Sequence, residues 1–270
     1  MRLTLLVLAG SLATYPLAAQ APVEVARERA EYIAWLTDSP VSPLAAIAQQ
    51  PIGAGLRLGP QDADVPLDDV ADHRLTERGG AISLESGGAT RPLPRGQAVR
   101  LGGYTIIADG PPGHSVLTVF GPNRHGTPPG YYEYVPSLAF SGPLAPPERK
   151  GRVRVLGVDG IEVEAVEAGS VMVPIGGGRV RLRVLRLPGA GPDESELEIF
   201  FRDGTSGRGS YPAGRFVALE PAGNGQYRLD FNRARNPFCA YSSAYACPAP
   251  WRGNTIPAEV VAGERYAAAK

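Results

Sequence analysis

Glycine and proline interrupt this chain so often that long helices are excluded from most of it. The 270 residues include 34 glycines and 27 prolines. Both residues are unfavourable inside helices and common in turns. Short apolar runs lie between them, and 43% of the residues are hydrophobic, enough for a packed core. We therefore predict a mainly β protein of many short strands joined by turns.

The apolar runs give ten candidate strands, whose spacing predicts antiparallel β-sandwich or barrel modules. In the clearest, arginines and apolar residues alternate from Arg179 to Val184, which gives one cationic and one apolar face. The cationic face is either an anion-binding stripe or a solvated sheet face opposite glutamates such as Glu162 and Glu164, and we favour the second. The candidate strands are Tyr104–Ala108, Val116–Phe120, Tyr132–Val135, Val153–Val155, Ile161–Val166, Val171–Pro174, Val180–Leu187, Leu197–Phe201, Phe216–Leu219 and Tyr227–Phe231.

One helix is predicted, close to the N-terminus. Ala26, Ala30, Ile33 and Leu36 recur at helical spacings and form one apolar stripe. The helix ends before Pro40, because the residue that precedes a proline disfavours helical angles.

The first 19 residues are typical of a secretory signal peptide. Arg2 precedes an apolar run over residues 3–13, and small residues follow up to Ala19, the expected cleavage site. The run is shorter than the roughly 20 residues that span a bilayer, and no later apolar segment reaches about 18. We therefore expect a periplasmic or secreted protein with a cleaved signal peptide and no transmembrane segment. No cysteine near the cleavage site could carry a lipid anchor.

The Pro-rich stretch Gly142–Pro147 is the best candidate for a boundary between modules. We predict the signal peptide over residues 1–19 and the helix with an N-terminal β module over 20–141. A Pro-rich linker follows over 142–150, and a C-terminal β module over 151–270.

Charge and motifs exclude several classes of function. Lysine plus arginine equals aspartate plus glutamate, 27 each, so no net field draws the protein to nucleic acid or an anionic membrane. The three histidines, His73, His114 and His125, are scattered. No metal-ligand set, phosphate loop or nucleophile elbow is present, so we expect neither cofactor nor metal.

Cys239 and Cys247 enclose seven residues, and export would place both in an oxidising compartment. A disulfide between them is our preferred interpretation, and it could add roughly 2–3 kcal/mol of stability. Two free buried thiols, or a functional cysteine pair, are the alternatives.

The last third of the chain carries a dense and distinctive motif. It contains Arg202-Asp203-Gly204-Thr205-Ser206, Tyr211-Pro212-Ala213-Gly214-Arg215, Asp230-Phe231-Asn232, Asn236-Pro237-Phe238-Cys239-Ala240-Tyr241, Cys247-Pro248, Asn254 and Ala262-Gly263-Glu264. This segment resembles the domain of unknown function 1684 family, most clearly over residues 195–266, with a weaker likeness over Arg27–Leu44. The resemblance implies a bacterial or archaeal protein and carries no established activity.

The chain departs from the family pattern in three segments. Gly209 and Gly253 stand where members tend to carry glutamate, and Arg235 stands where they tend to carry tyrosine. If the family worked through a pair of glutamates, this member would be impaired. The departures therefore weaken an interpretation as a paired-carboxylate hydrolase.

The polar residues of the motif form the candidate site. The leading hypothesis is a non-catalytic ligand-binding or envelope-associated module, with an unknown small molecule or envelope protein as its partner. Arg202 or Arg215 would clamp an anionic group while Asp203 and Asn232 orient it. The candidate ligand-binding residues are Arg202, Asp203, Thr205, Tyr211, Arg215, Asp230, Asn232, Asn236 and Asn254.

Two other interpretations of the same residues stay open. A hydrolase would use Asp203 or Asp230 as a general base. Alternatively, the aspartates and asparagines bond to the backbone of their own turns, and buried Arg–Asp pairs tie the turns together.

Overall fold

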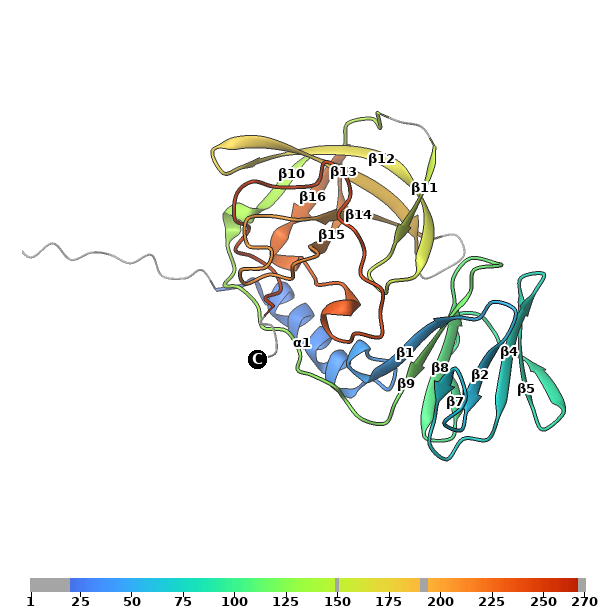
Figure 1. Ribbon diagram of the computed structural model, residues 1–270. Helices are drawn as coiled ribbons and strands as arrows, with labels where there is room; N and C mark the ends of the chain where they lie inside the picture. Colours follow the sequence, from blue (N-terminus) through green and yellow to red (C-terminus); the bar gives the residue numbers. More distant parts are fainter. Residues whose placement is uncertain (1–19, 149–150, 190–193, 267–270) are drawn as a thin grey trace, which may run out of the picture.

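A computed structural model of the protein describes residues 20–148, 151–189 and 194–266. Over these residues the chain forms three β-sheets and one α-helix, α1 (Val23–Asp38), as Figure 1 shows. All strand pairs but one are antiparallel, so the predicted mainly β, antiparallel fold with a single N-terminal helix is confirmed. The expected signal peptide, residues 1–19, lies outside the described residues.

The N-terminal module is a sandwich of two sheets. The first has the order β1-β9-β8-β7 and the second β3-β2-β4-β5-β6, with β2 and β3 parallel. Apolar side chains of both sheets, such as Leu58, Leu75, Ile106 and Leu117, meet in one fully buried core. The strands are β1 (Ala46–Pro51), β2 (Leu56–Gly59), β3 (Val65–Pro66), β4 (His73–Arg78), β5 (Ala81–Ser86), β6 (Ala89–Pro92), β7 (Val99–Leu101), β8 (Tyr104–Asp109) and β9 (Val116–Phe120).

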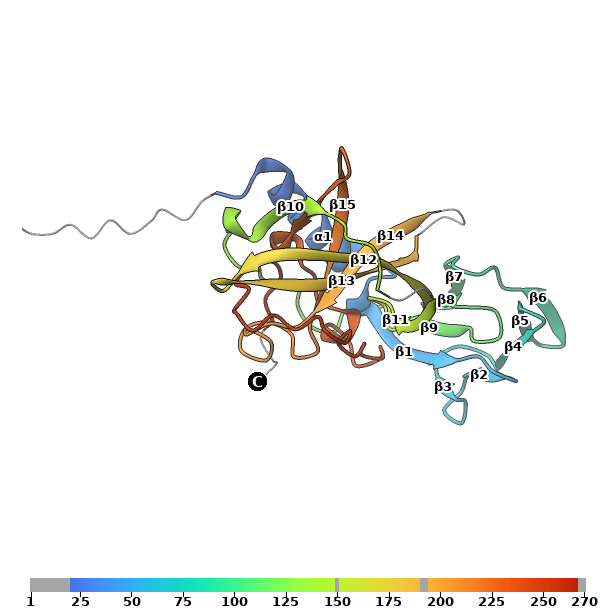
Figure 2. The same ribbon diagram turned by 90° about the horizontal axis from the view of Figure 1, so that it is seen from above.

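The C-terminal module is built on a seven-stranded sheet of order β10-β16-β15-β14-β13-β12-β11. Its strands are β10 (Ala139–Pro143), β11 (Arg152–Leu156), β12 (Glu162–Ile175), β13 (Gly178–Pro188), β14 (Ser195–Phe201), β15 (Arg215–Gly223) and β16 (Gln226–Asp230). Two backbone hydrogen bonds between Ala145 and Ser170 join the segment after β10 to β12, and the sheet thereby curls into an irregular barrel (Figure 2). The neighbouring Gly169 must be glycine, because a Cβ there would lie 2.0 Å from the Ala145 carbonyl oxygen.

The segment after β16 contains little regular structure, yet it supplies much of the barrel core. Phe231, Ile256 and Val260 are buried against residues of β14 and β15. A second cluster, on Phe200, Phe216 and Trp251, is held by stacking of the two phenylalanine rings 4.3 Å apart. Four short 3₁₀ helices complete the described elements: η1 (Pro43–Ala45), η2 (Pro136–Leu138), η3 (Phe231–Arg233) and η4 (Phe238–Ala240).

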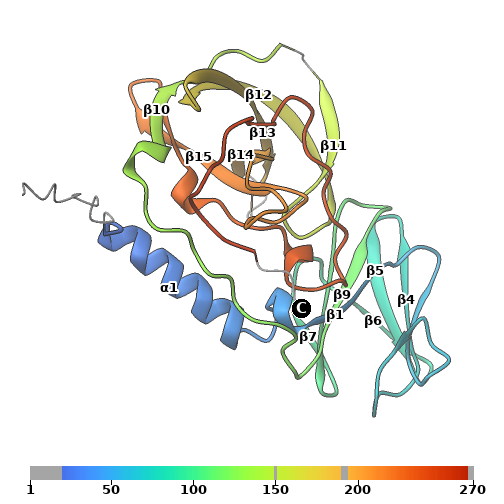
Figure 3. The same ribbon diagram turned by 60° about the vertical axis from the view of Figure 1, so that its left-hand side comes forward.

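Helix α1 packs on the C-terminal module rather than on the sandwich (Figure 3). Arg29 donates hydrogen bonds to the carbonyl oxygens of Tyr132 and Asn232, and Glu28 forms an ion pair with Arg233. The sequence analysis grouped α1 with the N-terminal β module, whereas these contacts join it to the C-terminal module.

Strand β10 likewise pairs with β16 of the C-terminal sheet, although it lies at the expected boundary. The expected linker over residues 142–150 therefore begins inside β10. The position of the domain boundary itself stays a prediction.

Nine of the ten candidate strands lie in strands of the structure, and none of the nine extends more than one residue beyond its strand. Ile161–Val166 and Val171–Pro174 are parts of one long strand, β12, which is interrupted by a bulge near Gly169. Tyr132–Val135 was wrong: this segment is no strand, because its amides bond to the Gly263 carbonyl oxygen and the Asn232 side chain. Strands β1 to β7 and β10 were not predicted, because they are short and mostly mixed in polarity.

The arginine row on β13 lies on a solvated face, as we favoured. Arg181 pairs with Glu148, and Arg183 lies 2.7 Å from Glu167 on the neighbouring strand β12. Two of the three arginines of the row are therefore paired, which matches a solvated face better than an anion-binding stripe. Glu162 and Glu164, which we expected opposite the row, pair instead with Arg154 and Arg152 of β11.

Among the described residues, no helix combines the length and the apolar character needed to cross a bilayer.

Candidate functional site

Asp203 lies at the start of a tight turn, and both of its carboxylate oxygens are occupied. Oδ2 accepts hydrogen bonds from the Thr205 amide (3.0 Å), the Thr205 hydroxyl (2.7 Å) and the Val260 amide (2.8 Å). Oδ1 accepts from Arg215 (3.2 Å) and from the Ser206 hydroxyl (3.3 Å). Buried and saturated in this way, Asp203 fixes the geometry of the turn and has no free lone pair to act as a base.

Arg215 extends from β15 into the same place and is fully buried. Besides Asp203 it donates to three carbonyl oxygens, those of Val260 (2.8 Å), Glu264 (3.3 Å) and Ala262. A buried cation keeps its charge only when it is paired and hydrogen-bonded in this manner. We call Asp203, Thr205 and Arg215 the Asp–Arg lock, since they tie the 203–210 turn to the 260–264 segment.

Asp230 and Asn232 form a second tie, at η3. Asp230 accepts from the Asn232 side chain and from Arg228 and Arg233, each within 3.0 Å. The Asn232 amide group bonds both the N–H and the C=O of Val135, as a paired strand would.

Asn254 and Asn236 hold loops in a similar way. Asn254 bonds the N–H and C=O of Arg183 and the carbonyl oxygen of Phe200, and so joins the 251–256 loop to two strands. Asn236 donates to the Arg265 carbonyl oxygen, while its own Oδ1 is buried without a partner. Arg202 is exposed.

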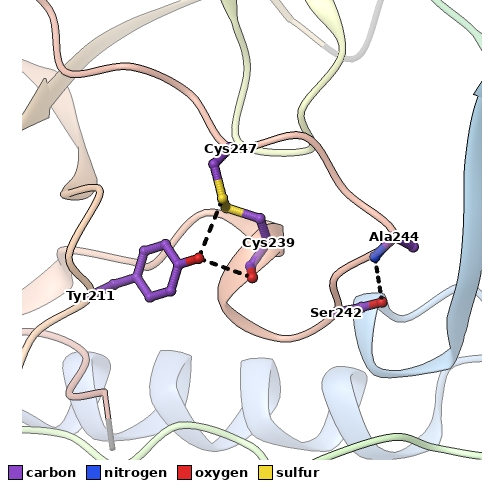
Figure 4. Close-up of a disulfide and its surroundings, with 5 residues drawn as sticks. All are labelled: Tyr211, Cys239, Ser242, Ala244 and Cys247. Atoms are coloured by element: carbon purple, nitrogen blue, oxygen red, sulfur yellow. Dashed lines mark hydrogen bonds between the residues drawn. A yellow bond between two sulfur atoms is a disulfide. The ribbon is translucent and has the colours of Figure 1, made fainter. Parts of the chain in front are cut away.

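The two cysteines are joined in a disulfide, as we preferred. The Tyr211 hydroxyl donates to the Cys239 carbonyl oxygen (3.1 Å) and lies 3.3 Å from Cys247 Sγ (Figure 4). The bridged loop packs against the sandwich, where Ser242 donates to the Ala46 carbonyl oxygen. Tyr211 therefore belongs to the junction that orders this loop.

The candidate residues thus do not converge on one pocket. Asp203, Thr205 and Arg215 come together in the Asp–Arg lock, and Asp230 and Asn232 come together at η3. Arg202 lies next to Asn254, whose backbone carbonyl oxygen accepts from the Arg202 amide (3.0 Å), while Asn236 and Tyr211 belong to other loops. Most of these contacts match the interpretation in which the polar residues hold turns and loops in place. Of the candidate residues, Asp230 and Asn232 line a cavity between α1 and the barrel.

That cavity, which we call the helix pocket, has a volume of about 260 Å³. Helix α1 supplies one wall, and β15, β16 and η3 supply the other, so the pocket exists only because α1 packs on the barrel. Val25 and Ala218 give it an apolar part. Its polar lining consists of Glu28, Arg29, Tyr32, Tyr131, Glu220, Arg228, Asp230, Asn232, Arg233 and Arg235.

The four arginines of the helix pocket differ in their partners. Arg228 and Arg233 are paired with Asp230, and Arg233 also with Glu28. Arg29 donates to two carbonyl oxygens and lies over the Tyr131 ring, 4.6 Å from its centroid, while its Nε is buried without a partner. Arg235 has no hydrogen bond or ion pair to its guanidinium from any described residue.

Arg235 is exposed to solvent and lines the helix pocket. Its guanidinium lies 5.8 Å from the centroid of Tyr32. Burial lowers its pKa, but Tyr32 and the acids Glu198 and Glu264 outweigh this effect, and the net pKa is raised. The group is therefore a permanent cation that lines a cavity and lacks a close counter-ion.

Two buried carboxyls lie behind this part of the pocket. Burial raises the pKa of Glu264 to about 7, against the opposing hydrogen bonds from Tyr241 (2.5 Å) and from the Asn236 amide (2.7 Å). Burial also raises the pKa of Glu198 to about 7, with Arg235 acting in the opposite direction. Both groups therefore change charge near neutral pH.

Sequence reasoning missed most of the helix pocket. Arg29 and Tyr32 lie one turn apart on α1, and Arg235 is a departure from the family pattern, so each carried a weak signal. Glu264 was quoted in the motif but not assigned to a site. Nothing in the sequence indicates that α1 would meet η3 across the barrel.

Taken together, the described chain is a curled antiparallel barrel that carries an arginine-lined pocket closed by a helix, preceded by a β-sandwich. The chain belongs to the family described as protein of unknown function (DUF1684), whose pattern matches residues 129–265. The match confirms the resemblance and begins further upstream than the segment that carried it. Helix α1, which closes the pocket, lies outside the matched region.

Among solved structures, the chain is similar to the solution NMR structure of an uncharacterised protein from Haloarcula marismortui. The identity is 30%, the match covers 51% of this chain and 75% of that one, and the TM-score is 0.44. No curated protein matches the chain.

Proposed function

We propose that this protein is an exported, non-catalytic binding module that takes a small organic anion into the helix pocket. The observation that carries the proposal is Arg235, an exposed arginine that lines the cavity and whose guanidinium has no close counter-ion among the described residues. A carboxylate or phosphate group would pair with it in the bidentate geometry that arginine favours.

The rest of the pocket supports a ligand with an apolar or aromatic body. Tyr32, Tyr131, Val25 and Ala218 provide flat and apolar contact next to the cation. A volume of about 260 Å³ suits a metabolite rather than a peptide, because pockets for drug-sized molecules start near 300 Å³.

A hydrolytic role for the aspartates receives little support from their surroundings. Asp203 is saturated by five hydrogen bonds within the Asp–Arg lock. Asp230 borders the pocket, but its oxygens are engaged by Asn232, Arg228 and Arg233. A general base needs a lone pair that can reach the substrate.

Export remains part of the proposal. The disulfide between Cys239 and Cys247 is in keeping with it, since such bonds persist in oxidising compartments. We favour a small molecule over an envelope protein as the partner, because the helix pocket is a cavity of small-molecule size.

Native mass spectrometry of protein recovered from the extracytoplasmic fraction tests the proposal. We expect a discrete mass excess that disappears on denaturation. A thermal-shift comparison then uses benzoate, with benzamide as a neutral analogue of the same shape. Benzoate should raise the Tm of the wild type and leave that of Arg235→Ala unchanged, and benzamide should affect neither.

The matched control is Arg186→Ala, which removes an exposed arginine of β13 outside the pocket. It should respond to benzoate as the wild type does. The proposal is refuted if the protein carries no bound mass and benzoate shifts neither Tm, or if Arg235→Ala responds like the wild type.

A further inference from the structure

We infer that Glu264 is a proton-binding site coupled to the helix pocket, so that the pocket takes up its anion together with a proton. This inference rests on the proposed function and adds the regulation of the same site.

The first support is the position of the Glu264 carboxyl. The side chain is fully buried, and its Oε2 accepts hydrogen bonds from Tyr241 and from the Asn236 amide. Its Oε1 is buried without any partner among the described residues. An ionised carboxylate with one unsatisfied oxygen is costly in such surroundings, and a proton on it removes the charge.

The second support is a chain of contacts from Glu264 to the pocket wall. Tyr241 donates a hydrogen bond to Glu264 (2.5 Å), and it is coupled electrostatically to Tyr32, which lines the pocket. Tyr131, another lining residue, pairs through its backbone with Glu264. The carboxyl therefore lies directly behind the aromatic wall.

The third support is that Glu264 and the ligand would share the same cations. Arg29 and Arg235 line the pocket, and both interact electrostatically with Glu264. An anion bound at Arg235 adds negative charge near Glu264 and offsets the positive charge that favours its ionised form. Protonation of Glu264 and anion binding must then favour each other, because coupling between two sites is reciprocal.

The groups that face Glu264 come from every element packed around it. Arg29 and Tyr32 come from α1, Tyr131 from the segment before η2, Arg215 from β15, Arg235 from the segment after η3, and Tyr241 from the bridged loop. All of these groups except Glu264 keep one charge state near neutral pH, because the tyrosines next to it have raised pKa values and arginine stays protonated. Glu198, on the far side of Arg235, is the other carboxyl that can titrate in this range.

The direction of the pH dependence follows from this coupling. With a pKa near 7 in the free protein, Glu264 is mostly protonated at pH 6 and mostly ionised at pH 8. Affinity for an anion should therefore fall as the pH rises. If binding raises this pKa by one unit, the affinity falls about fivefold from pH 6 to pH 8.

Isothermal titration calorimetry with benzoate, which stays ionised over this range, tests the inference. Titrations near pH 7 in two buffers of different ionisation enthalpy give the number of protons taken up on binding. We expect a fractional proton uptake in the wild type and a fall in affinity from pH 6 to pH 8. Glu264→Gln, which keeps the shape and an acceptor oxygen for Tyr241, should bind benzoate without either effect.

Two further variants sharpen the result. Glu220→Gln removes an exposed carboxyl of the pocket and should keep the pH dependence of the wild type. Glu198→Gln tests the rival carboxyl, because Glu198 also interacts with Arg235 and titrates in the same range. A pH dependence that is lost in Glu198→Gln and kept in Glu264→Gln overturns the inference. If Glu264→Gln does not fold, the proton count of the wild type decides, and a count of zero overturns the inference.

The inference and the proposed function fail in different ways. Binding that depends on Arg235 but takes up no proton, or a pH dependence that persists in Glu264→Gln, refutes the role of Glu264 and leaves the proposed function intact. Absence of benzoate binding at every pH, together with absence of a bound mass in the recovered protein, refutes both.

Discussion

The Asp–Arg lock and the helix pocket are both built around arginine, and they use it in opposite ways. Arg215 is fully buried, pairs with Asp203 and donates to three carbonyl oxygens. Arg235 is exposed and lines the helix pocket, and its guanidinium has no hydrogen bond or ion pair to any described residue. A cation whose donors are used internally stabilises the fold, whereas one whose donors face a cavity remains available to a ligand.

This difference changes how the family motif is understood. Most of its polar residues tie loops to the barrel: Asn232 to Val135, Asn254 to Arg183, and Arg215 to the 260–264 segment. These ties are needed because the segment after β16 contributes to the core with little secondary structure of its own. Most polar residues of the motif are therefore needed for the fold, and few are available to bind a ligand.

The largest expected loss of stability comes from removing Arg215 from the Asp–Arg lock. Arg215→Ala leaves Asp203 ionised and buried without its cation, and we expect a loss of about 3–5 kcal/mol in the free energy of unfolding. Urea denaturation measures it, with the exposed Arg186→Ala as control, which should change stability by less than about 0.5 kcal/mol. If Arg215→Ala were as stable as that control, the lock would have no structural role.

A smaller effect is expected at the disulfide. The double variant Cys239→Ser with Cys247→Ser should lose about 2–3 kcal/mol, because the short loop gains freedom in the unfolded chain. Urea denaturation of the variant against the oxidised wild type measures the loss. Alkylation of the unreduced wild type should label neither cysteine, and labelling of both would contradict the bridge.

The smallest expected loss of stability is at Arg235, in the helix pocket. Arg235→Ala should change the free energy of unfolding by less than about 1 kcal/mol, since no ion pair or hydrogen bond to its guanidinium is lost. The same urea titration measures it beside Arg215→Ala. A loss as large as that of Arg215→Ala would mean that Arg235 also serves the fold, and the contrast between the two arginines would disappear.

Much of the architecture could be predicted from local sequence patterns. The alternation from Arg179 to Val184 predicts a strand without any knowledge of its neighbours, because successive side chains point to opposite faces of a sheet. The helical spacing from Ala26 to Leu36 likewise needs no distant partner. Short strands such as β6, exposed at all four positions, have no such signal, since only the neighbouring strand β5 makes them strands.

The candidate site was harder to predict, for a reason that Tyr132–Val135 illustrates. This segment has the composition of a strand, yet the Asn232 side chain, 97 residues away, takes the place of a neighbouring strand for Val135. Asp203 and Arg215 were singled out correctly as polar residues of the motif. Their partners, which lie near residue 260, determine that they form a lock and not a ligand clamp.

The sequence by itself determined the helix, the longer strands, the class of the fold and the family, since these depend on local periodicity and on a contiguous motif. Only the tertiary structure decided which arginine is paired and which is free. That difference depends on how α1 and the segment after β16 meet across the barrel, because a side chain becomes buried, paired or accessible only through residues far from it in the chain.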